Sequence, residues 1–382
     1  MKILMFTTDY LPNIGGVTAH LRGLAGALCE AGHRVSVVTN VPGDDGGGDP
    51  FSVLRVSERV RWLPTARGRR VQFLLNLARP LRTELRGYDL VHFHTVDPLS
   101  QALSTLWRGR RLVATNHTSM FVADSRDPRR ARPWRRFFDR MDGIIAPSKE
   151  LADLTVALGT GARKVRYLPN GVDASVFHPD RSGAPCRERY GIRADEALLL
   201  CPRRLVEKNG CIYLARAMGR IVRRLPGVRV LFVGDGPERA PITRELEAAG
   251  CLDRAVFARS IPNAEMPGYY AAADVVVTPS LIEATSISVL EAMATARPVV
   301  ATRVGGLPAL VEHGRTGYLV GPGDEAELAA RICDLLADPA CRARMGESAR
   351  RRVLDSFTWD RIAELTVDVY QTLGSGRDRR AA

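Results

Sequence analysis

The strongest constraint on the fold is an alternation of short apolar runs with amphipathic helical segments, which occurs twice along the chain. In the first half, apolar runs typical of strands begin at residue 2 and recur at 35–39, 89–94, 111–115, 143–147 and 165–169. A second series occupies 197–202, 228–234, 275–279, 298–302 and 317–320. Strands that alternate with helices form parallel sheets covered by helices on both faces. The pattern therefore predicts an α/β protein with two doubly wound, Rossmann-like domains.

A segment rich in Gly, Pro, Ser and Asp, residues 170–186, separates the two series and is typical of a linker. A chain of 382 residues is also longer than one ordinary core supports. We expect an N-terminal domain over 1–172, a second domain over 187–356 and a C-terminal segment over 357–382. Because such sheets bind ligands at the carboxyl ends of their strands, two of them face to face would enclose a cleft.

Glycines and basic residues follow several of the predicted strands. Gly15 and Gly16 open the first helix, where small residues let a phosphate or a sugar approach the positive helix end. A tight turn explains this pair equally well. Arg203 or Arg204, together with Lys208, follows the run 197–202, and these cations could hold a diphosphate. The alternative is a pair of surface cations without a ligand.

Histidines and carboxylates give no pattern typical of a metal centre. His92 and His94 lie two apart on a predicted strand and share a face, but no further group of ligands accompanies them. His117 follows the strand 111–115 and is expected at the edge of the cleft, unless it is a turn histidine with satisfied hydrogen bonds. The chain has no Asp-x-Asp sequence that could hold a metal-bound diphosphate. We expect no metal or cofactor, and charge neutralisation by Arg, Lys and helix ends.

The stretch EATSISVLE carries a glutamate at each end, Glu283 and Glu291. Eight residues of helix correspond to a rise of about 12 Å and a rotation of about 80° away from the same face. The two carboxylates therefore cannot form a close acid pair on one helix. If the helix begins near Ser286 or Ser288, they can address different parts of one ligand. A capping box between Ser288 and Glu291 is the competing interpretation.

Positive charge is concentrated in residues 51–140, which hold 19 Lys and Arg against 7 Asp and Glu. The richest pieces are Arg67-Gly-Arg69-Arg70 and residues 126–140, where arginines alternate with Trp134, Phe137 and Phe138. Such a patch could bind an anionic membrane surface, a phosphorylated acceptor or nucleic acid. A solvated arginine-rich surface is the simpler alternative. No nucleic-acid motif accompanies the charge, so nucleic acid is not expected as a partner.

Two further features of the sequence bear on the cellular compartment of the protein. The seven cysteines are scattered and never form CxxC, which favours a reducing cytoplasm. No apolar run approaches the length of about 20 residues that a membrane-spanning helix needs. We expect a cytoplasmic protein with peripheral contact at the inner membrane face through the basic residues.

The order and spacing of the motifs resemble those of the retaining family 4 glycosyltransferases of GT-B fold. The matching blocks include PNIGGVTAHLRGLAGAL, IIAPSKEL, LPNGVDASVFHP, RRLVEKNG, FVGDGP, VVVTPSLIEATSISVLEAMATARPVVATRVGG and HGRTGYLVGPGD. The most specific of these is the E-x7-E element with its LEAMA continuation. The resemblance implies a final helix, from about Trp359, that crosses back onto an acceptor-binding N-terminal domain.

The resemblance also implies roles for individual residues. Arg204 and Lys208 would hold the donor diphosphate, and the helix start at Ser286 and Ile287 would cap it. Glu291 would bind the nucleotide ribose, and Glu283 the hydroxyls of the donor sugar. The remaining positions lie in the N-terminal domain: Gly16 would line the phosphate and acceptor side, and His117 would lie near the transferred sugar.

This chain departs from the family pattern at several positions. Ala284-Thr285-Ser286 replaces a glycine-rich stretch after Glu283, and Arg203 replaces a common glycine before Arg204. Ala296 and Ala309 also differ from the usual glycine and glutamate. We expect these departures to affect the choice of substrate, with donor specificity set between Glu283 and Glu291.

The resulting functional hypothesis is a retaining transfer of a hexose-type sugar from a nucleoside-diphosphate sugar to an acceptor hydroxyl. The acceptor is a glycan, a lipid or a small metabolite. The first rival is a nucleotide-sugar epimerase of the same architecture, which would consume donor without an acceptor. The second is a non-catalytic protein that binds nucleotide sugars or an anionic membrane.

Overall fold

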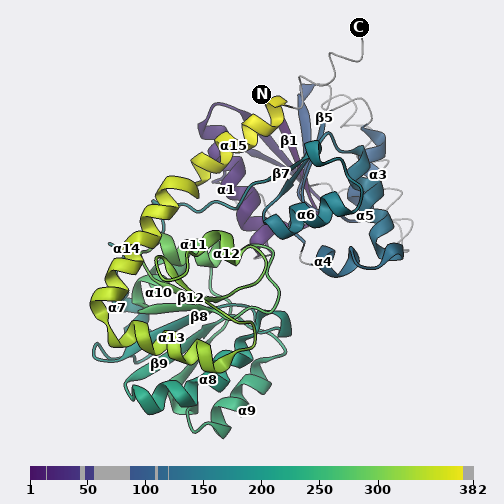
Figure 1. Ribbon diagram of the computed structural model, residues 1–382. Coiled ribbons are helices and arrows are strands. Elements are labelled where there is room, and N and C mark those ends of the chain that lie inside the picture. Colours follow the sequence, from purple (N-terminus) through teal and green to yellow (C-terminus); the bar gives the residue numbers. More distant parts are fainter. Residues whose placement is uncertain (14, 44–47, 56–86, 108–110, 119, 373–382) are drawn as a thin grey trace. The chain divides into compact units, whose positions relative to one another are not determined.

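Figure 1 shows the protein as a computed structural model, which describes residues 1–382 apart from 14, 44–47, 56–86, 108–110, 119 and 373–382. The chain forms two compact units. The N-terminal unit comprises Met1–Gly171 and Trp359–Ala382, and the C-terminal unit comprises Val172–Thr358. The last helix therefore belongs to the N-terminal unit, although its sequence follows the C-terminal unit.

The N-terminal unit is built on a parallel sheet with the strand order β3-β2-β1-β4-β5-β6-β7. Its strands are β1 (Lys2–Thr7), β2 (Arg34–Thr39), β3 (Ser52–Arg55), β4 (Leu90–Phe93), β5 (Arg111–Thr115), β6 (Gly143–Ala146) and β7 (Val165–Tyr167). In the middle of the sheet, Ile3 pairs with Val35 on one side and with Leu90 on the other. Apolar residues on these strands are buried on both faces, as expected for a covered parallel sheet.

Helices connect the strands of this unit and cover its sheet. They are α1 (Gly16–Glu30), α3 (Pro98–Leu106), α4 (Met120–Asp124), α5 (Pro128–Arg140), α6 (Lys149–Ala157), the 3-10 turn η3 (Ala162–Lys164) and α15 (Trp359–Thr372). The last helix packs in the same hydrophobic cluster as α1, through Ile362, Ala363 and Tyr370. Gly23 of α1 allows this approach, because a Cβ there would lie 2.1 Å from the ring of Trp359.

The C-terminal unit repeats the architecture with the strand order β10-β9-β8-β11-β12-β13. Its strands are β8 (Ala197–Pro202), β9 (Val228–Val233), β10 (Ala255–Ala258), β11 (Val275–Thr278), β12 (Val299–Thr302) and β13 (Gly317–Val320). Its helices are α7 (Ala184–Arg189), η4 (Glu207–Asn209), α8 (Cys211–Arg224), α9 (Arg239–Ala248), η5 (Leu252–Arg254), α10 (Met266–Ala272), α11 (Ile287–Ala294), α12 (Leu307–Leu310), α13 (Glu325–Ala337) and α14 (Pro339–Ser356).

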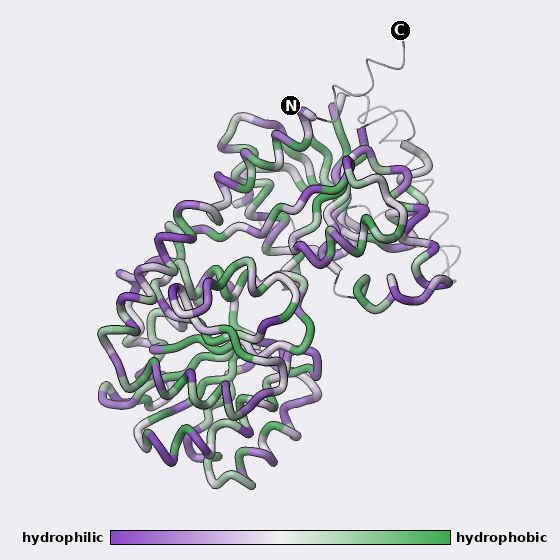
Figure 2. The backbone as a smooth tube through the Cα atoms, viewed as in Figure 1, coloured by the Kyte–Doolittle hydropathy of each residue, from purple (hydrophilic) through white to green (hydrophobic). Residues whose placement is uncertain are grey.

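Apolar strands run through the interior of each unit, while polar residues dominate the outer turns and helix faces (Figure 2). The C-terminal sheet separates two apolar clusters. One contains Leu198 and Leu200 of β8 with residues of α10 and α11, and the other contains Leu199 and Cys201 with residues of α8 and α13. The alternation along β8 places neighbouring residues on opposite faces of the sheet. This covered sheet holds the loops at its carboxyl edge in fixed positions.

Two edge strands, β3 and β10, were not among the predicted strands. Among the described strands, each pairs with one neighbour, at the outside of its sheet. Three of the four residues of β10 are only partly buried, so its sequence lacks the apolar run that marks a central strand. Part of the expected linker also packs into the C-terminal unit, because Val172, Phe177 and Cys186 belong to its hydrophobic cluster. No helix among the described residues is long and apolar enough to span a membrane.

Candidate functional site

The carboxyl ends of β8 and β11 bring together Arg203 and Glu283. Arg203 comes directly after β8, and its guanidinium forms an ion pair with Glu283 in the loop after β11. The same guanidinium donates to Ser280 Oγ at 2.8 Å and to Asn209 Oδ1 at 3.2 Å. Only 11% of the Arg203 side chain and 12% of the Glu283 side chain are exposed. Glu283 is therefore a largely buried, paired carboxylate rather than a free acid.

Arg204 and Lys208 lie on the same loop as Arg203. Arg204 is exposed, and Lys208 is partly buried within η4. Burial lowers the pKa of Lys208; Glu283 acts in the opposite direction, whereas Arg204 and Arg203 lower the pKa further. Three cations thus interact around one carboxylate. The excess positive charge suits a doubly charged anion such as a diphosphate.

The N-terminus of α11 adjoins these charges. Ser286 is its N-cap residue, and no side chain forms a capping hydrogen bond to the first turn. Arg203 Nη1 donates to Ser286 Oγ at 3.4 Å, which ties the helix start to the ion pair. Uncapped amides at a helix start, together with the helix dipole, favour a negatively charged ligand. The competing interpretation, a capping box between Ser288 and Glu291, is wrong. Ser288 lies inside the first turn of α11, and the carboxylate of Glu291 accepts a hydrogen bond from Tyr270.

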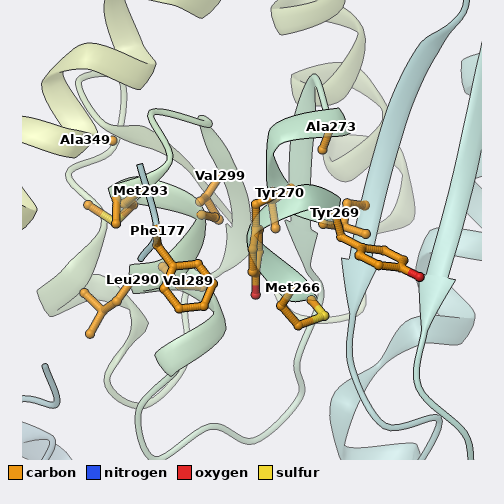
Figure 3. Packing of buried hydrophobic residues seen from close by; sticks show 14 of the residues in the cluster. Phe177, Met266, Tyr269, Tyr270, Ala273, Val289, Leu290, Met293, Val299 and Ala349 are labelled. Atoms are coloured by element: carbon orange, nitrogen blue, oxygen red, sulfur yellow. The ribbon is translucent and has the colours of Figure 1, made fainter. Parts of the chain in front are cut away.

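Glu291 lies in the middle of α11 and is buried. Its Oε2 accepts a hydrogen bond of 2.7 Å from the hydroxyl of Tyr270 on α10. Figure 3 shows Tyr270 among Phe177, Met266 and Val289, so its ring is held by apolar packing. Burial raises the pKa of Glu291 to about 7, although the hydrogen bond from Tyr270 acts in the opposite direction. A buried carboxylate with one oxygen committed can accept further hydrogen bonds through the other oxygen.

We expect the stability of the free protein to carry a signature of Glu291. The folded state holds its proton up to about pH 7, whereas the unfolded chain releases it near 4.5. Stability therefore falls as pH rises through this window, by about 3 kcal/mol at roughly 1.4 kcal/mol per pKa unit. Glu291→Gln removes this loss, since a neutral amide can still accept from Tyr270. Denaturant unfolding at pH 5 and pH 8 gives the free energy of unfolding of the unaltered protein and of Glu291→Gln. If the two proteins differ in stability by the same amount at both pH values, the assignment is contradicted.

The predicted residues of the N-terminal unit lie at the corresponding edge of its sheet. Gly16 is the first residue of α1, and a Cβ at this position would meet no atom within 4 Å. The described protein atoms therefore do not require glycine there, and the space beside the helix start is open. His117 follows β5 and is partly buried. Burial lowers its pKa well below the usual value, with smaller contributions from His20 and His92, so the ring is neutral at pH 7.

His117 belongs to a cluster of imidazoles that the sequence did not reveal. His20, His94 and His117 each bring one ring nitrogen to within 4.8 Å of the others. His20 comes from α1, far from the other two in the chain, and its Nδ1 contacts Asn170 Oδ1 at 2.9 Å. Ring nitrogens of three neutral imidazoles are ligands that could coordinate Zn²⁺. His92, in contrast, contacts Tyr370 and Thr115 through its two nitrogens and is not available as a ligand.

Most of the arginine-rich segment 126–140 forms α5, which begins at Pro128. Trp134, Phe137 and Phe138 point into the core of the N-terminal unit, while Arg132, Arg135 and Arg136 are exposed. The aromatic residues therefore pack the protein interior and do not form part of an external surface. The other predicted basic piece, Arg67-Gly-Arg69-Arg70, lies outside the described residues.

Comparison with known proteins gives family matches in both units. Residues 14–176 match the family described as Glycosyltransferase Family 4, and residues 196–338 match Glycosyl transferases group 1. A GDP-mannose-dependent alpha-(1-6)-phosphatidylinositol monomannoside mannosyltransferase of Mycolicibacterium smegmatis is 32% identical over 95% of this chain and 97% of its own. The chain belongs to glycosyltransferase family 4. It is also 30% identical to the D-inositol 3-phosphate glycosyltransferase of Corynebacterium urealyticum, over 93% of this chain and 85% of that protein.

As a family 4 glycosyltransferase, the chain shares its fold with solved structures. Sucrose-phosphate synthase from Thermosynechococcus elongatus superposes with a TM-score of 0.80 and 26% sequence identity, over 98% of this chain and 99% of that one. The predicted GT-B fold of two Rossmann-like domains is thereby confirmed, as is the use of a nucleotide-sugar donor for glycosyl transfer. In this family 4 glycosyltransferase, Tyr270 is an addition to the candidate site, and the pairing of Arg203 with Glu283 is a contact that the sequence did not indicate.

Proposed function

We propose that this glycosyltransferase moves a hexose from a nucleoside-diphosphate sugar to an acceptor hydroxyl with retention of the anomeric configuration. The observation that carries the proposal is the group of three cations around Glu283, beside the uncapped start of α11. This arrangement provides an anion site and a sugar-binding carboxylate at one edge of the sheet. Doubly wound sheets bind nucleotides at this edge.

Each part of the donor has a proposed partner in the C-terminal unit. Arg204, Lys208 and the amides at Ser286 and Ile287 bind the diphosphate. Glu291, with one oxygen on Tyr270, accepts from the ribose hydroxyls. Glu283 accepts from a hydroxyl of the sugar. The diphosphate gains negative charge as the glycosidic bond breaks, so the cations bind the transition state more strongly than the ground state.

In the proposed route, the acceptor hydroxyl attacks the anomeric carbon of the donor sugar from the same face as the departing diphosphate. Both glutamates of the site already accept a hydrogen bond on one oxygen, from Arg203 or Tyr270. They are thus held as ligand-binding groups rather than as nucleophiles. The departing phosphate takes the acceptor proton. In the N-terminal unit, we propose that Gly16 and neutral His117 contact substrate, and that the reaction needs no metal.

Incubation of the purified protein with GDP-mannose, UDP-glucose and related donors, with and without acceptors, tests this function. Release of nucleoside diphosphate that depends on acceptor, with an α-linked product from an α-linked donor by NMR, is the expected result. Conversion of the donor sugar without acceptor would instead indicate an epimerase. Binding of a donor without any turnover would indicate a non-catalytic protein.

The names of the two relatives suggest a phosphorylated inositol or an inositol lipid as acceptor. The exposed arginines of α5 would hold the protein at an anionic membrane surface that carries such a lipid.

We therefore expect R132A/R135A/R136A to bind anionic vesicles more weakly than the unaltered protein. Each arginine near such a surface contributes about 1 kcal/mol, so the loss is about 100-fold in the partition coefficient. Co-sedimentation with phosphatidylserine vesicles at low and high salt measures it. The triple variant R220A/R223A/R224A, in exposed positions of α8, is the matched control. Equal binding by both triple variants contradicts a membrane role of α5.

A further inference from the structure

The guanidinium of Arg203 connects three separate segments of the C-terminal unit. It starts from the loop after β8 and reaches Asn209 in η4, Ser280 and Glu283 after β11, and Ser286 at the start of α11. A side chain with so many partners fixes the relative positions of these segments. The loop after β11 is also tied to η4 by its backbone, since Leu281 and Ile282 both donate to the Lys208 carbonyl.

The hydrogen bonds around Glu283 leave its two oxygens in different states. Oε2 accepts from Arg203 and from Ser280 Oγ, the latter at 3.3 Å. Ser280 Oγ in turn accepts from Arg203 at 2.8 Å, so the three groups form a closed set. Among the described residues, Oε1 has no hydrogen-bond partner. The pair therefore presents one oriented acceptor atom instead of a rotating carboxylate.

The sequence changes in this region fit together around Arg203. Ser286 stands in the stretch that replaces the family's glycines after Glu283, and its hydroxyl is one of the acceptors of Arg203. A glycine-rich loop would offer Arg203 no hydroxyl at this position. Arg203 and the hydroxyl of Ser286 therefore occur together as one hydrogen-bonded arrangement.

We propose that Arg203 is a positioning residue that sets donor specificity, by holding Glu283 so that Oε1 alone accepts one hydroxyl of the donor sugar. This inference rests on the proposed function and extends it. Glu283 touches the sugar, and Arg203 acts through Glu283. A single fixed acceptor rejects a donor that lacks the matching hydroxyl, because the oriented Oε1 then loses its hydrogen bond to the sugar. The donors selected are neutral sugars with that hydroxyl, whereas a carboxylated sugar meets a like charge.

Replacement of Arg203 by glycine, the residue common in the family, is the direct test. We expect Arg203→Gly to lower kcat by about 100-fold with the preferred donor, the loss typical of a misplaced catalytic contact. The ratio of kcat/KM for that donor to kcat/KM for the corresponding monodeoxy donors should be about 10-fold or more lower in Arg203→Gly than in the unaltered protein. Binding of the free nucleoside diphosphate should change much less, since Arg204, Lys208 and α11 remain. Arg203→Lys keeps the positive charge but lacks the planar guanidinium that donates to several acceptors at once, so it should regain only part of kcat.

A control variant separates positioning from folding. Arg187 is likewise partly buried, pairs with Asp274 and donates to the carbonyls of Ala272 and Glu196, but lies outside the proposed site. We expect Arg187→Gly to lose stability while the folded protein keeps its kcat and its donor discrimination. If Arg203→Gly behaves in the same way, Arg203 is only structural and the inference is wrong.

A second variant addresses the loop. R203G/A284G/S286G restores the glycines of the family pattern and should accept a wider set of donors than Arg203→Gly, with part of kcat regained. An unchanged donor profile contradicts the coupling between Arg203 and the loop.

Calorimetric binding of intact and monodeoxy donors without acceptor needs no turnover and separates the two proposals. If no acceptor-dependent transfer occurs but the protein still discriminates between intact and monodeoxy donors through Arg203, the proposed function is wrong and the inference about Arg203 stands. Equal binding of intact and all monodeoxy donors by the unaltered protein overturns the inference.

Discussion

Replacing Lys208 by alanine is expected to reduce kcat/KM for nucleoside diphosphate release by about 100- to 1,000-fold, the usual loss for one preorganised transition-state donor. Lys208 is partly buried between Glu283, Arg203 and Arg204, and its ammonium group interacts with all three. Water would screen an exposed lysine, but a partly buried one acts on the diphosphate in a weaker dielectric. Arg204→Ala should cost less, because Arg204 is exposed.

The loop itself should survive the Lys208→Ala change. The contacts of residue 208 with Leu281 and Ile282 use its backbone carbonyl, which alanine retains. Most of the loss should appear in kcat, because the charge on the leaving diphosphate grows as the bond breaks. Initial rates over a range of donor concentrations, with Lys149→Ala as an exposed lysine control, measure the effect. A Lys208→Ala enzyme with unchanged kcat would remove Lys208 from the mechanism.

Central strands and glycine turns of this protein could be predicted from sequence because their signals are local. Strands such as β8 and β11 are continuous apolar runs. Gly210, two residues after Lys208, has a positive φ of 63° that favours glycine. Edge strands carry a weaker signal, since only one side is paired. The missed strand β10 shows this directly, because most of its residues are only partly buried.

The partners within the candidate site could not be predicted in the same way. Tyr270 approaches Glu291 only because α10 and α11 pack side by side, and nothing near Glu291 in the sequence indicates an acceptor for a tyrosine hydroxyl. The sequence marked Arg203 as a departure from the family pattern and as a possible diphosphate-binding cation, but only the fold shows its pairing with Glu283. The same limit applies to His20, since α1 brings it close to His94 and His117, which follow β4 and β5.

The turn Gly234-Asp235-Gly236-Pro237, which follows β9, supports the loop that carries the arginines. Gly234 has φ 138°, and a Cβ there would lie 2.3 Å from the carbonyl oxygen of Arg203. Backbone hydrogen bonds join the two segments, with Leu205 N donating to Asp235 O at 3.0 Å and Glu238 N donating to Leu205 O at 2.9 Å. The position of Arg203 and Arg204 therefore depends on a close contact between two backbones.

We expect Gly234→Ala to lower the free energy of unfolding of the C-terminal unit by about 3–5 kcal/mol, among the largest effects of single substitutions. Two costs combine. The positive φ is unfavourable for alanine, and the contact with the Arg203 carbonyl cannot be relieved by rotating a side chain. The loop must move, so the fraction that folds should bind nucleoside diphosphate at least 10-fold more weakly.

Gly250→Ala is the matched control for this substitution. Gly250 also has a positive φ, of 65°, but a Cβ there would meet no atom within 4 Å. It therefore carries the conformational cost alone, about 1–2 kcal/mol, and leaves the arginine loop in place. Denaturant unfolding and calorimetric titration with GDP and UDP, applied to both variants, separate strain from displacement of the loop. Equal losses of stability in the two variants, with unchanged nucleotide binding, would show that the turn does not position Arg203 and Arg204.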